Sequence, residues 1–162
     1  MKQVYIAKFE HIGYITLWTE ENHFIRILFG KNFKLNNSTE LLETPNKLMQ
    51  QFLTDFKKFL NGKKIEFDFP YILKVTPFQE RVLNTLKKVK FGNLITYKEL
   101  SIKSGSPNAY RAVGMACKMN PLPIIIPCHR VIKSNGKIGG FAGGINLKKF
   151  LINIEKGANY GI

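Results

Sequence analysis

Residues 76–118 read TPFQERVLNTLKKVKFGNLITYKELSIKSGSPNAYRAVGMACK, and this stretch marks the starts of several helices. Thr76-Pro77-Phe78-Gln79 and Thr96-Tyr97-Lys98-Glu99 each place a threonine three residues before a Gln or Glu. In that arrangement the threonine and the later side chain each satisfy a backbone N–H group of the other residue, which caps a helix start. Both tetrapeptides therefore predict the first turn of a helix.

The second of these helices is expected to stop at Ser104-Gly105, and Ser106-Pro107 predicts the start of the next, which continues toward Lys118. Two short helices joined by a Gly-containing turn are typical of a helix-turn-helix. Arg111 lies near the start of the second helix, the part of a recognition helix that contacts DNA. Helical hairpins that do not bind DNA are also common, so this motif alone does not decide the function.

The flanking sequence completes the fold class. Short runs rich in β-branched and aromatic residues predict strands at 4–9, 12–18, 24–29 and 65–69. Apolar residues at helical spacing predict a helix over 48–60, and another that Asn146 caps and Gly157 ends. We expect an α+β fold, with a small N-terminal β-meander plus helix domain (1–72) packed on a mostly helical C-terminal domain (73–162) that contains the helix-turn-helix.

The charge of the chain is concentrated in its second part. Among the 162 residues, 25 Lys and Arg against 11 Asp and Glu give a net charge of +14. Residues 1–70 carry 10 basic and 8 acidic side chains (+2), and residues 71–162 carry 15 and 3 (+12). Such a field attracts polyanions, and nucleic acid is the partner that we expect. The alternative is a solvated lysine-rich surface without a partner.

The cysteines and the hydropathy indicate a cytoplasmic protein. Cys117 and Cys128 are the two cysteines, and the chain begins with no charged-then-apolar leader, which favours a reducing compartment. The longest wholly aliphatic run covers 124–126, far short of the roughly 20 residues that span a bilayer. Neither the cysteines nor His11 and His23 form a zinc framework, so we expect no metal and no membrane association.

A proline-rich segment carries the reactive residues of the chain. Residues 120–131 read NPLPIIIPCHRV, and the prolines should hold Cys128 on a stiff, strand-like segment. A histidine and an arginine beside a cysteine favour its thiolate, which is the nucleophilic form. Glu155, the only acidic residue after Glu99, could orient His129. In the alternative interpretation Cys128 and His129 are ordinary core residues, as we expect Cys117 to be.

Taken together, these motifs occur in the order and spacing of one family. They are Thr76-Pro77-Phe78-Gln79, Thr96-Tyr97, Tyr110-Arg111-Ala112-Val113-Gly114, Asn120-Pro121, Ile126-Pro127-Cys128-His129-Arg130-Val131, Gly139-Gly140-Phe141-Ala142-Gly143-Gly144, and Lys148 with Glu155. The chain resembles the O6-alkylguanine-DNA alkyltransferases, closely from about residue 76 to 157 and only in architecture before that.

The resemblance implies a reaction and the residues that perform it. Cys128 would take the alkyl group from O6-alkylguanine, and also from O4-alkylthymine, in double-stranded DNA, and would keep it after a single turnover. The implied catalytic residues are Cys128, His129, Glu155, Asn120, Tyr97 and Lys148. His129 would take the thiol proton through water, Asn120 would brace the turn that carries the cysteine, and Tyr97 would protonate the leaving base with Lys148 nearby.

The resemblance also implies how the DNA is held. The implied substrate-binding residues are Val131, Phe141, Ala142 and Gly143, and the implied DNA-binding residues are Thr96, Ser106, Tyr110, Arg111, Ala112 and Arg130. Arg111 would fill the gap left by the flipped nucleotide while the helix-turn-helix lies in the minor groove. No cofactor is implied, and the protein is expected to act as a monomer whose N-terminal domain is a scaffold.

The sequence departs from the family pattern at two positions, and two other functions are alternatives to the family's activity. Tyr110 stands where many relatives have a small residue, and Ala142 where some have a serine, which affects the expected pocket width for bulky alkyl groups. A helix-turn-helix regulator would explain the charge but not the Pro-Cys-His-Arg string. A thiol redox sensor would explain Cys128 but not Tyr97, Asn120 and Glu155.

Overall fold

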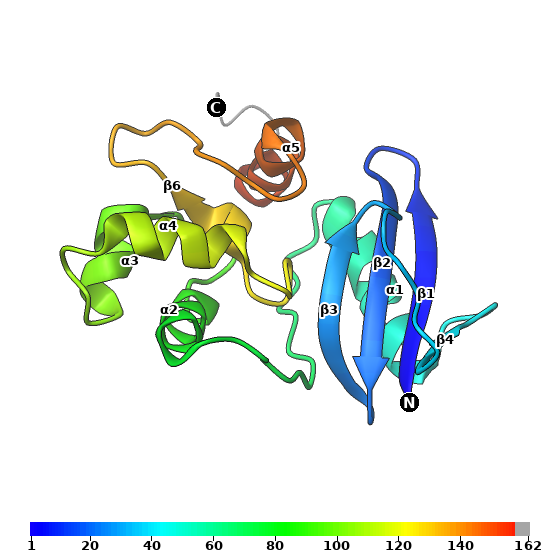
Figure 1. Cartoon of the computed structure of the whole chain (residues 1–162). Coiled ribbons are helices and arrows are strands. Elements are labelled where there is room, and N and C mark those ends of the chain that lie inside the picture. Colours follow the sequence, from blue (N-terminus) through cyan, green and yellow to red (C-terminus); the bar gives the residue numbers. More distant parts are fainter. Residues whose placement is uncertain (158–162) are drawn as a thin grey trace.

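The structure is a computed structural model, and it describes residues 1–157. The fold is α+β, as the sequence predicts: a sheet of strands comes first and helices follow (Figure 1). The elements in chain order are β1 (Lys2–Phe9), β2 (Gly13–Glu20), β3 (His23–Phe29), β4 (Thr39–Leu41), α1 (Lys47–Leu60), α2 (Pro77–Lys87), β5 (Ile95–Thr96), α3 (Tyr97–Lys103), α4 (Tyr110–Lys118), the short 3-10 helix η1 (Cys128–Arg130), β6 (Val131–Ile132) and α5 (Ile145–Lys156).

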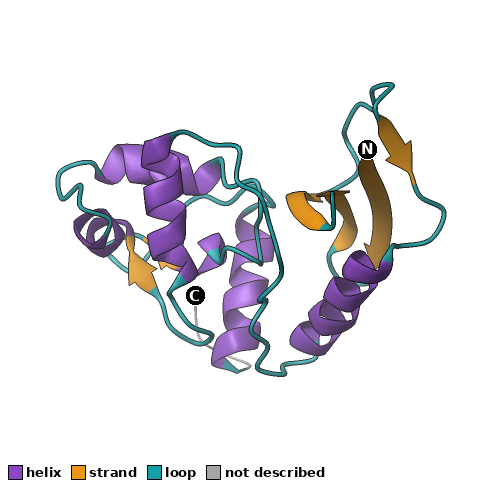
Figure 2. Cartoon of the chain, turned by 90° about the horizontal axis from the view of Figure 1, so that it is seen from below, coloured by secondary structure: helices purple, strands orange, loops and turns teal. Residues whose placement is uncertain are grey.

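The N-terminal half is one sheet with a helix against it. The strand order is β3-β2-β1-β4, with antiparallel pairing except between β1 and β4, which are parallel. Helix α1 covers one face of the sheet (Figure 2) and buries Phe52, Phe56 and Phe59 completely. These rings form the aromatic centre of the core and give the sheet its buried face.

The predicted strand at 65–69 is wrong. This segment lies outside every strand, although it buries Phe67 and Phe69, and the chain reaches the edge of the sheet only at an isolated bridge between Tyr71 and Phe24. Its alternating apolar residues serve packing, without a neighbouring strand to pair with. The fourth strand is instead β4, which sequence analysis missed.

The C-terminal half groups helices α2 to α5 around the small parallel pair β5 and β6. Both predicted capping boxes are present, at Thr76 with Gln79 before α2 and at Thr96 with Glu99 before α3. Helices α3 and α4 form the predicted helix-turn-helix, and α3 ends at Ser104 as expected.

Two predicted helix starts need correction. Helix α4 begins at Tyr110, because the Ser106 carbonyl accepts from Ala109 N in a preceding turn and the Ser106 hydroxyl accepts from Arg81. Helix α5 is preceded by Gly144, whose φ of 94° suits only glycine, so Asn146 lies inside the helix and does not cap it. Gly157, with φ of 79°, follows the end of α5 as predicted.

The two halves share their core. Ile27 N of β3 donates to Pro121 O at 2.8 Å, and the ring of Phe59 in α1 lies 6.2 Å from the imidazole of His129. One cluster of buried apolar residues runs from Ile15 to Leu151. A division into domains 1–72 and 73–162 therefore stays a prediction. Within residues 1–157, no helix has the length and apolar character needed to cross a membrane.

Candidate active site

Cys128 lies in a tight turn, not on the strand-like segment that we predicted. Residues 128–130 form η1, in which Cys128 N donates to Ile126 O at 2.8 Å and Arg130 N to Pro127 O at 3.0 Å. Val131 then continues into β6, which pairs with β5. The prolines restrict the approach to the turn, but the local hydrogen bonds favour the 3-10 geometry over an extended chain.

Asn120 holds the loop that precedes this turn. Its amide nitrogen donates to Ile126 O at 2.9 Å, and its amide oxygen accepts from Leu122 N at 3.0 Å. Asn120 is buried, so both bonds are protected from water. Lys87, which sequence analysis did not single out, adds bonds from Nζ to Ile125 O and to Phe67 O, both at 2.8 Å.

His129 and Glu155 form a buried pair. His129 Nε2 lies 2.6 Å from Glu155 Oε1, and both side chains are almost completely enclosed. Burial alone would raise the pKa of Glu155, but hydrogen bonds from His129 and Arg130 and the positive charge of Arg130 outweigh it and lower that pKa to about 2. Glu155 is therefore an ionised acceptor, and His129 Nε2 carries the proton that it donates.

The other nitrogen of this imidazole is available as a base. Burial lowers the pKa of His129, more than the bond to Glu155 raises it, so the ring is neutral near pH 7. With the proton on Nε2, the lone pair lies on Nδ1, a buried atom that has no partner in the described part of the chain. A neutral imidazole oriented by a carboxylate is the arrangement of a general base.

Arg130 occupies a different place from the one that we expected. Its guanidinium donates to both carboxylate oxygens of Glu155 at 2.9–3.0 Å and to Val89 O at 2.6 Å. The residue is only 4% exposed. The prediction that Arg130 contacts DNA is therefore wrong: the side chain points inward and completes the shell of Glu155, together with Gly92 N at 3.1 Å from Oε2.

Lys148 and Tyr97 form a second polar group near the cysteine. Lys148 is fully buried, and its Nζ donates to Gly140 O at 3.1 Å and lies 3.5 Å from Tyr97 Oη. Burial lowers the pKa of Lys148 to about 8 and raises that of Tyr97 to about 12. Because the ammonium donates to the phenol oxygen, the Tyr97 hydroxyl hydrogen is free for another acceptor.

Both thiols are protonated near neutral pH. Burial raises the pKa of Cys128, against the smaller effects of Asn120 and Lys148, and raises that of Cys117 to about 12. Cys128 thus needs a base before it can act as a nucleophile. Cys117 is buried on α4, as expected for a packing residue.

A groove of about 910 Å³ lies beside this group. It is lined by Tyr97, Gly114 and Tyr110 from the helix-turn-helix on one side and by Lys133, Gly140 and Phe141 from the loop before α5 on the other. Gly139 has φ of 76°, and a Cβ there would meet Tyr97 Oη at 3.1 Å, so glycine lets the loop approach the ring.

Of the predicted DNA-binding and substrate-binding residues, Tyr110 and Phe141 line this groove. Tyr110, Arg111 and Ala112 are exposed on α4. Ala142 is exposed and Gly143 half-buried in the loop, whereas Val131, the residue after Arg130, is buried. The hydroxyls of Thr96 and Ser106 already accept protein hydrogen bonds, from Glu99 N and from Arg81. Among the described residues no three His, Cys, Asp or Glu side chains cluster as metal ligands.

Comparisons with known proteins agree with this geometry. Residues 77–157 match the family described as 6-O-methylguanine DNA methyltransferase, DNA binding domain, and residues 5–72 match its ribonuclease-like domain. A methylated-DNA–protein-cysteine methyltransferase of Methanosarcina acetivorans is 35% identical over 94% of this chain and 98% of its own. The constitutive enzyme of that name from Bacillus subtilis is 34% identical over 90% of both chains.

Solved structures give the same result. The crystal structure of Mycobacterium tuberculosis OGT in complex with DNA covers 95% of this chain and 92% of its own, with a TM-score of 0.85 and 31% identity. An O6-methylguanine DNA methyltransferase from Methanococcus jannaschii covers 97% and 96%, with a TM-score of 0.71 and 29% identity. This chain therefore shares its fold with both of these proteins. The chain belongs to the 6-O-methylguanine DNA methyltransferase family.

Proposed function

We propose that this protein repairs DNA by transferring an alkyl group from guanine O6 to Cys128. The observation that carries the proposal is the buried Cys128-His129-Glu155 arrangement in a chain of this family. A redox sensor or a simple DNA-binding regulator has no use for a carboxylate-oriented imidazole beside a thiol.

The first step is the activation of the thiol. The proton leaves Cys128 Sγ and reaches His129 Nδ1 through a water molecule, since neighbours in a turn do not face each other. Glu155, held ionised by Arg130, His129 and Gly92, stabilises the imidazolium that forms. Lys148 lies close enough to favour the thiolate by its charge.

The second step is displacement at the alkyl carbon. A bond forms between Sγ and that carbon, the bond from the carbon to O6 breaks, and its electron pair stays on guanine. The Tyr97 hydroxyl, with a pKa of about 12, keeps its proton at neutral pH and can give it to the leaving base. Lys148 can then replace that proton, because its ammonium already donates to Tyr97 Oη.

DNA enters through the groove beside α4. The guanine must leave the base stack to reach a buried thiol, and Arg111 on the exposed face of α4 would fill the gap. Tyr110 and Ala112 flank Arg111. Thr96, which caps α3, and Ser106, in the turn before α4, would contact the DNA backbone. Phe141, Ala142, Gly143 and Val131 would surround the flipped base. The proposal includes O4-alkylthymine as a second substrate, a monomeric protein and a cytoplasmic location.

The reaction ends with a thioether on Cys128. A thioether is not a leaving group for water and takes no part in thiol exchange, so no residue of the site can regenerate the thiol. Each molecule should therefore repair one lesion.

Intact mass spectrometry tests the proposal. After incubation with a duplex that contains O6-methylguanine, the protein should gain the mass of one methylene on the peptide with Cys128, and repaired DNA should plateau at one equivalent per active molecule. Cys128→Ser should bind duplex but accept no methyl group, and Cys117→Ser should react normally. Transfer in Cys128→Ser, or release of repaired DNA beyond one equivalent, would overturn the mechanism.

A further inference from the structure

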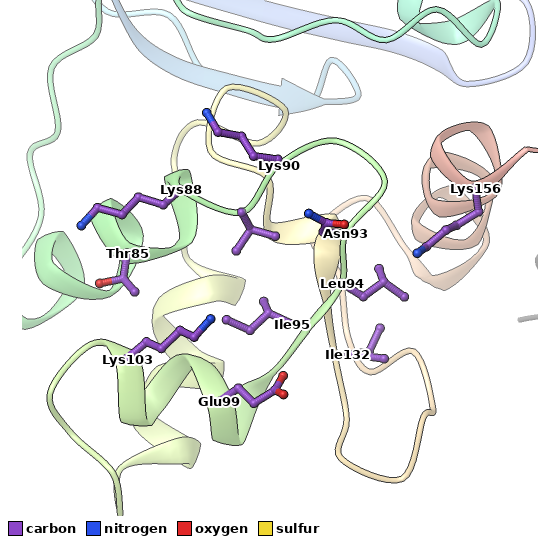
Figure 3. Close-up of a pocket in the computed structure, with 11 residues that line it drawn as sticks. Thr85, Lys88, Lys90, Asn93, Leu94, Ile95, Glu99, Lys103, Ile132 and Lys156 are labelled. Atoms are coloured by element: carbon purple, nitrogen blue, oxygen red, sulfur yellow. The ribbon is translucent and has the colours of Figure 1, made fainter.

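A second cationic feature lies apart from the groove beside α4. It is a pocket of about 760 Å³ between the end of α2, the loop before β5, helix α3 and the end of α5 (Figure 3). Four lysines from these separate elements line it: Lys88, Lys90, Lys103 and Lys156. We call it the lysine pocket.

Among the described residues, four lysines and one carboxylate line the lysine pocket. That carboxylate is Glu99, which accepts a hydrogen bond from Thr96 N at 2.8 Å in the capping box of α3 and interacts with the charge of Lys103. Within residues 1–157, the ammonium groups of Lys88, Lys90 and Lys103 form no hydrogen bond or ion pair. An excess of positive charge on a concave surface favours an anionic ligand, because concave walls concentrate the electric field.

The lysine pocket and the groove beside α4 are separate. No residue lines both. On α3, Lys98 lines the groove, whereas Glu99 and Lys103 line the pocket; on the next segment, Lys133 lines the groove and Ile132 the pocket. The α3 helix and the β5–β6 pair thus divide the two cationic sites, and a duplex in the groove is not expected to fill the pocket.

The backbone at the centre of the lysine pocket's wall is held by hydrogen bonds to Arg130 and Glu155, two buried residues of the candidate active site. Lys88, Val89, Lys90 and Asn93 line that wall, and Val89 O accepts from Arg130 Nη1 at 2.6 Å. Gly92 N, in the same loop, donates to Glu155 Oε2 at 3.1 Å. These bonds hold the backbone that carries Lys88 and Lys90, so the site is arranged before a ligand binds and loses less entropy on binding.

We propose that the lysine pocket binds the phosphodiester backbone of a second DNA segment. Duplex DNA carries about one negative charge per 1.7 Å of its axis, which suits several lysines placed around one opening. Lysine ammonium groups bind phosphates as point charges and read no base sequence. One molecule would then hold two DNA segments at once, one in the groove and one in the pocket, which would let it pass between segments without full release.

A bridging experiment tests this proposal, which depends on the proposed function only for the first duplex in the groove. Two short unmodified duplexes, one with a donor and one with an acceptor fluorophore, are mixed with a limiting amount of the full-length protein at low salt. Energy transfer, together with a sedimenting species of one protein and two duplexes, is expected for the wild type.

Matched variants assign the bridging to the lysine pocket. Lys90→Gln combined with Lys103→Gln should reduce bridging at least about tenfold, because each phosphate contact contributes close to one unit of salt slope, while single-duplex binding remains. Lys63→Gln combined with Lys64→Gln removes the same charge from an exposed turn after α1 and should leave bridging intact. Circular dichroism and melting of both variants check the fold.

Each outcome decides between the proposals. A wild type that binds one duplex but does not bridge, or bridging that both double variants lose equally, overturns the second site and leaves alkyl transfer untouched. If the wild type binds no duplex at all, the result would count against the proposed function instead. Inorganic triphosphate that shifts the amide resonances of Lys90 and Gly92, without any bridging, would show that the pocket takes small anions and would also overturn the proposal.

Discussion

The ring of Phe29 on β3 lies 5.7 Å from the ring of Phe141, centroid to centroid, and thereby joins the N-terminal sheet to the loop that lines the groove beside α4. Gly143 in the same loop is packed so closely that a Cβ there would come within 3.0 Å of Phe29 and 2.6 Å of Leu147. The N-terminal half therefore supports one wall of the candidate active site.

This contact predicts an effect of Phe29→Ala on the reaction. Releasing Phe141 should lower the rate of alkyl transfer at saturating duplex by about tenfold, because small misplacements of a binding loop are costly to catalysis. Single-turnover kinetics over a range of duplex concentrations separate this rate from affinity. Phe33→Ala, which loses a ring contact with Trp18 in the same sheet region, is the control, and Phe29→Leu should recover part of the rate. Equal rates for Phe29→Ala and Phe33→Ala would mean that Phe29 contributes only to stability.

The buried position of Arg130 gives a prediction about stability. Arg130→Met should lower the free energy of unfolding by about 3 to 5 kcal/mol, because it leaves Glu155 buried with fewer donors. Chemical denaturation at pH 7 measures this loss. The salt slope of duplex binding should not change, since the guanidinium is enclosed. A shallower slope in a stable variant would restore Arg130 as a DNA contact.

Arg111 should behave in the opposite way. Arg111→Ala should retain the melting temperature of the wild type, because its side chain is exposed on α4. Repair of O6-methylguanine in duplex DNA should slow by tenfold or more, as unstacking costs on the order of a few kcal/mol and the gap is no longer filled. Reaction with the free base O6-benzylguanine should be nearly unchanged, since it has no stack to open. Equal losses on both substrates would make Arg111 a structural residue.

Local patterns could be predicted from the sequence, and contacts between distant segments could not. The capping boxes at Thr76 and Thr96 depend on four consecutive residues, so both helix starts were found. Residues 65–69 have a strand pattern, but a strand also needs a neighbour, and the neighbour of β1 is the short β4. Nothing in the composition of 39–41 distinguishes it from a loop.

The candidate site shows the same limit. Motif order was enough to bring together Cys128, His129, Glu155 and Asn120. The direction of Arg130 was not predictable, because a basic residue beside a cysteine in a basic protein reads equally well as a DNA contact. Its role depends on Glu155, 25 residues later, and on the carbonyl of Val89, 41 residues earlier. The support from Phe29 also depends on a distant contact, and no local signal marks it.

The arrangement of Cys128, His129 and Glu155 leads to a prediction about the pH dependence of the transfer rate. The thiol pKa of Cys128 is raised by burial, and the pKa of His129 is lowered, so near pH 7 the base is neutral and the thiol protonated. The wild-type transfer rate should fall in acid as His129 becomes protonated, and fall again above about pH 8, where Lys148 loses the proton that it supplies to Tyr97.

Glu155→Gln tests whether this pH profile depends on the carboxylate beside His129. The amide cannot stabilise the imidazolium as the carboxylate does, so transfer at pH 7 should fall by roughly 10² or more. Up to about pH 8, where Lys148 is still charged, the remaining rate should rise about tenfold per pH unit, because the thiolate then forms by loss of the proton to solvent and its fraction grows in that proportion below the thiol pKa. Stopped-flow measurement on O6-methylguanine duplex gives both profiles. Parallel profiles for the two proteins would leave Glu155 with a structural role only.

The last prediction concerns the state of the protein after the reaction. Cys128 lies almost completely buried in η1, between the Asn120 bonds and the buried Val131, so an added methyl group must enter a packed space. Overpacking of this kind typically costs about 1 to 3 kcal/mol, which for a chain of this length corresponds to a melting temperature about 2 to 12 °C lower. Calorimetry of the methylated protein, freed of DNA, against the unreacted protein measures the difference. Incubation of Cys128→Ser with the same duplex controls for the treatment and should leave its melting temperature unchanged. If the methylated protein melts at the same temperature or higher, the pocket accommodates its product without strain, and Cys128 then has more free space around it than its burial indicates.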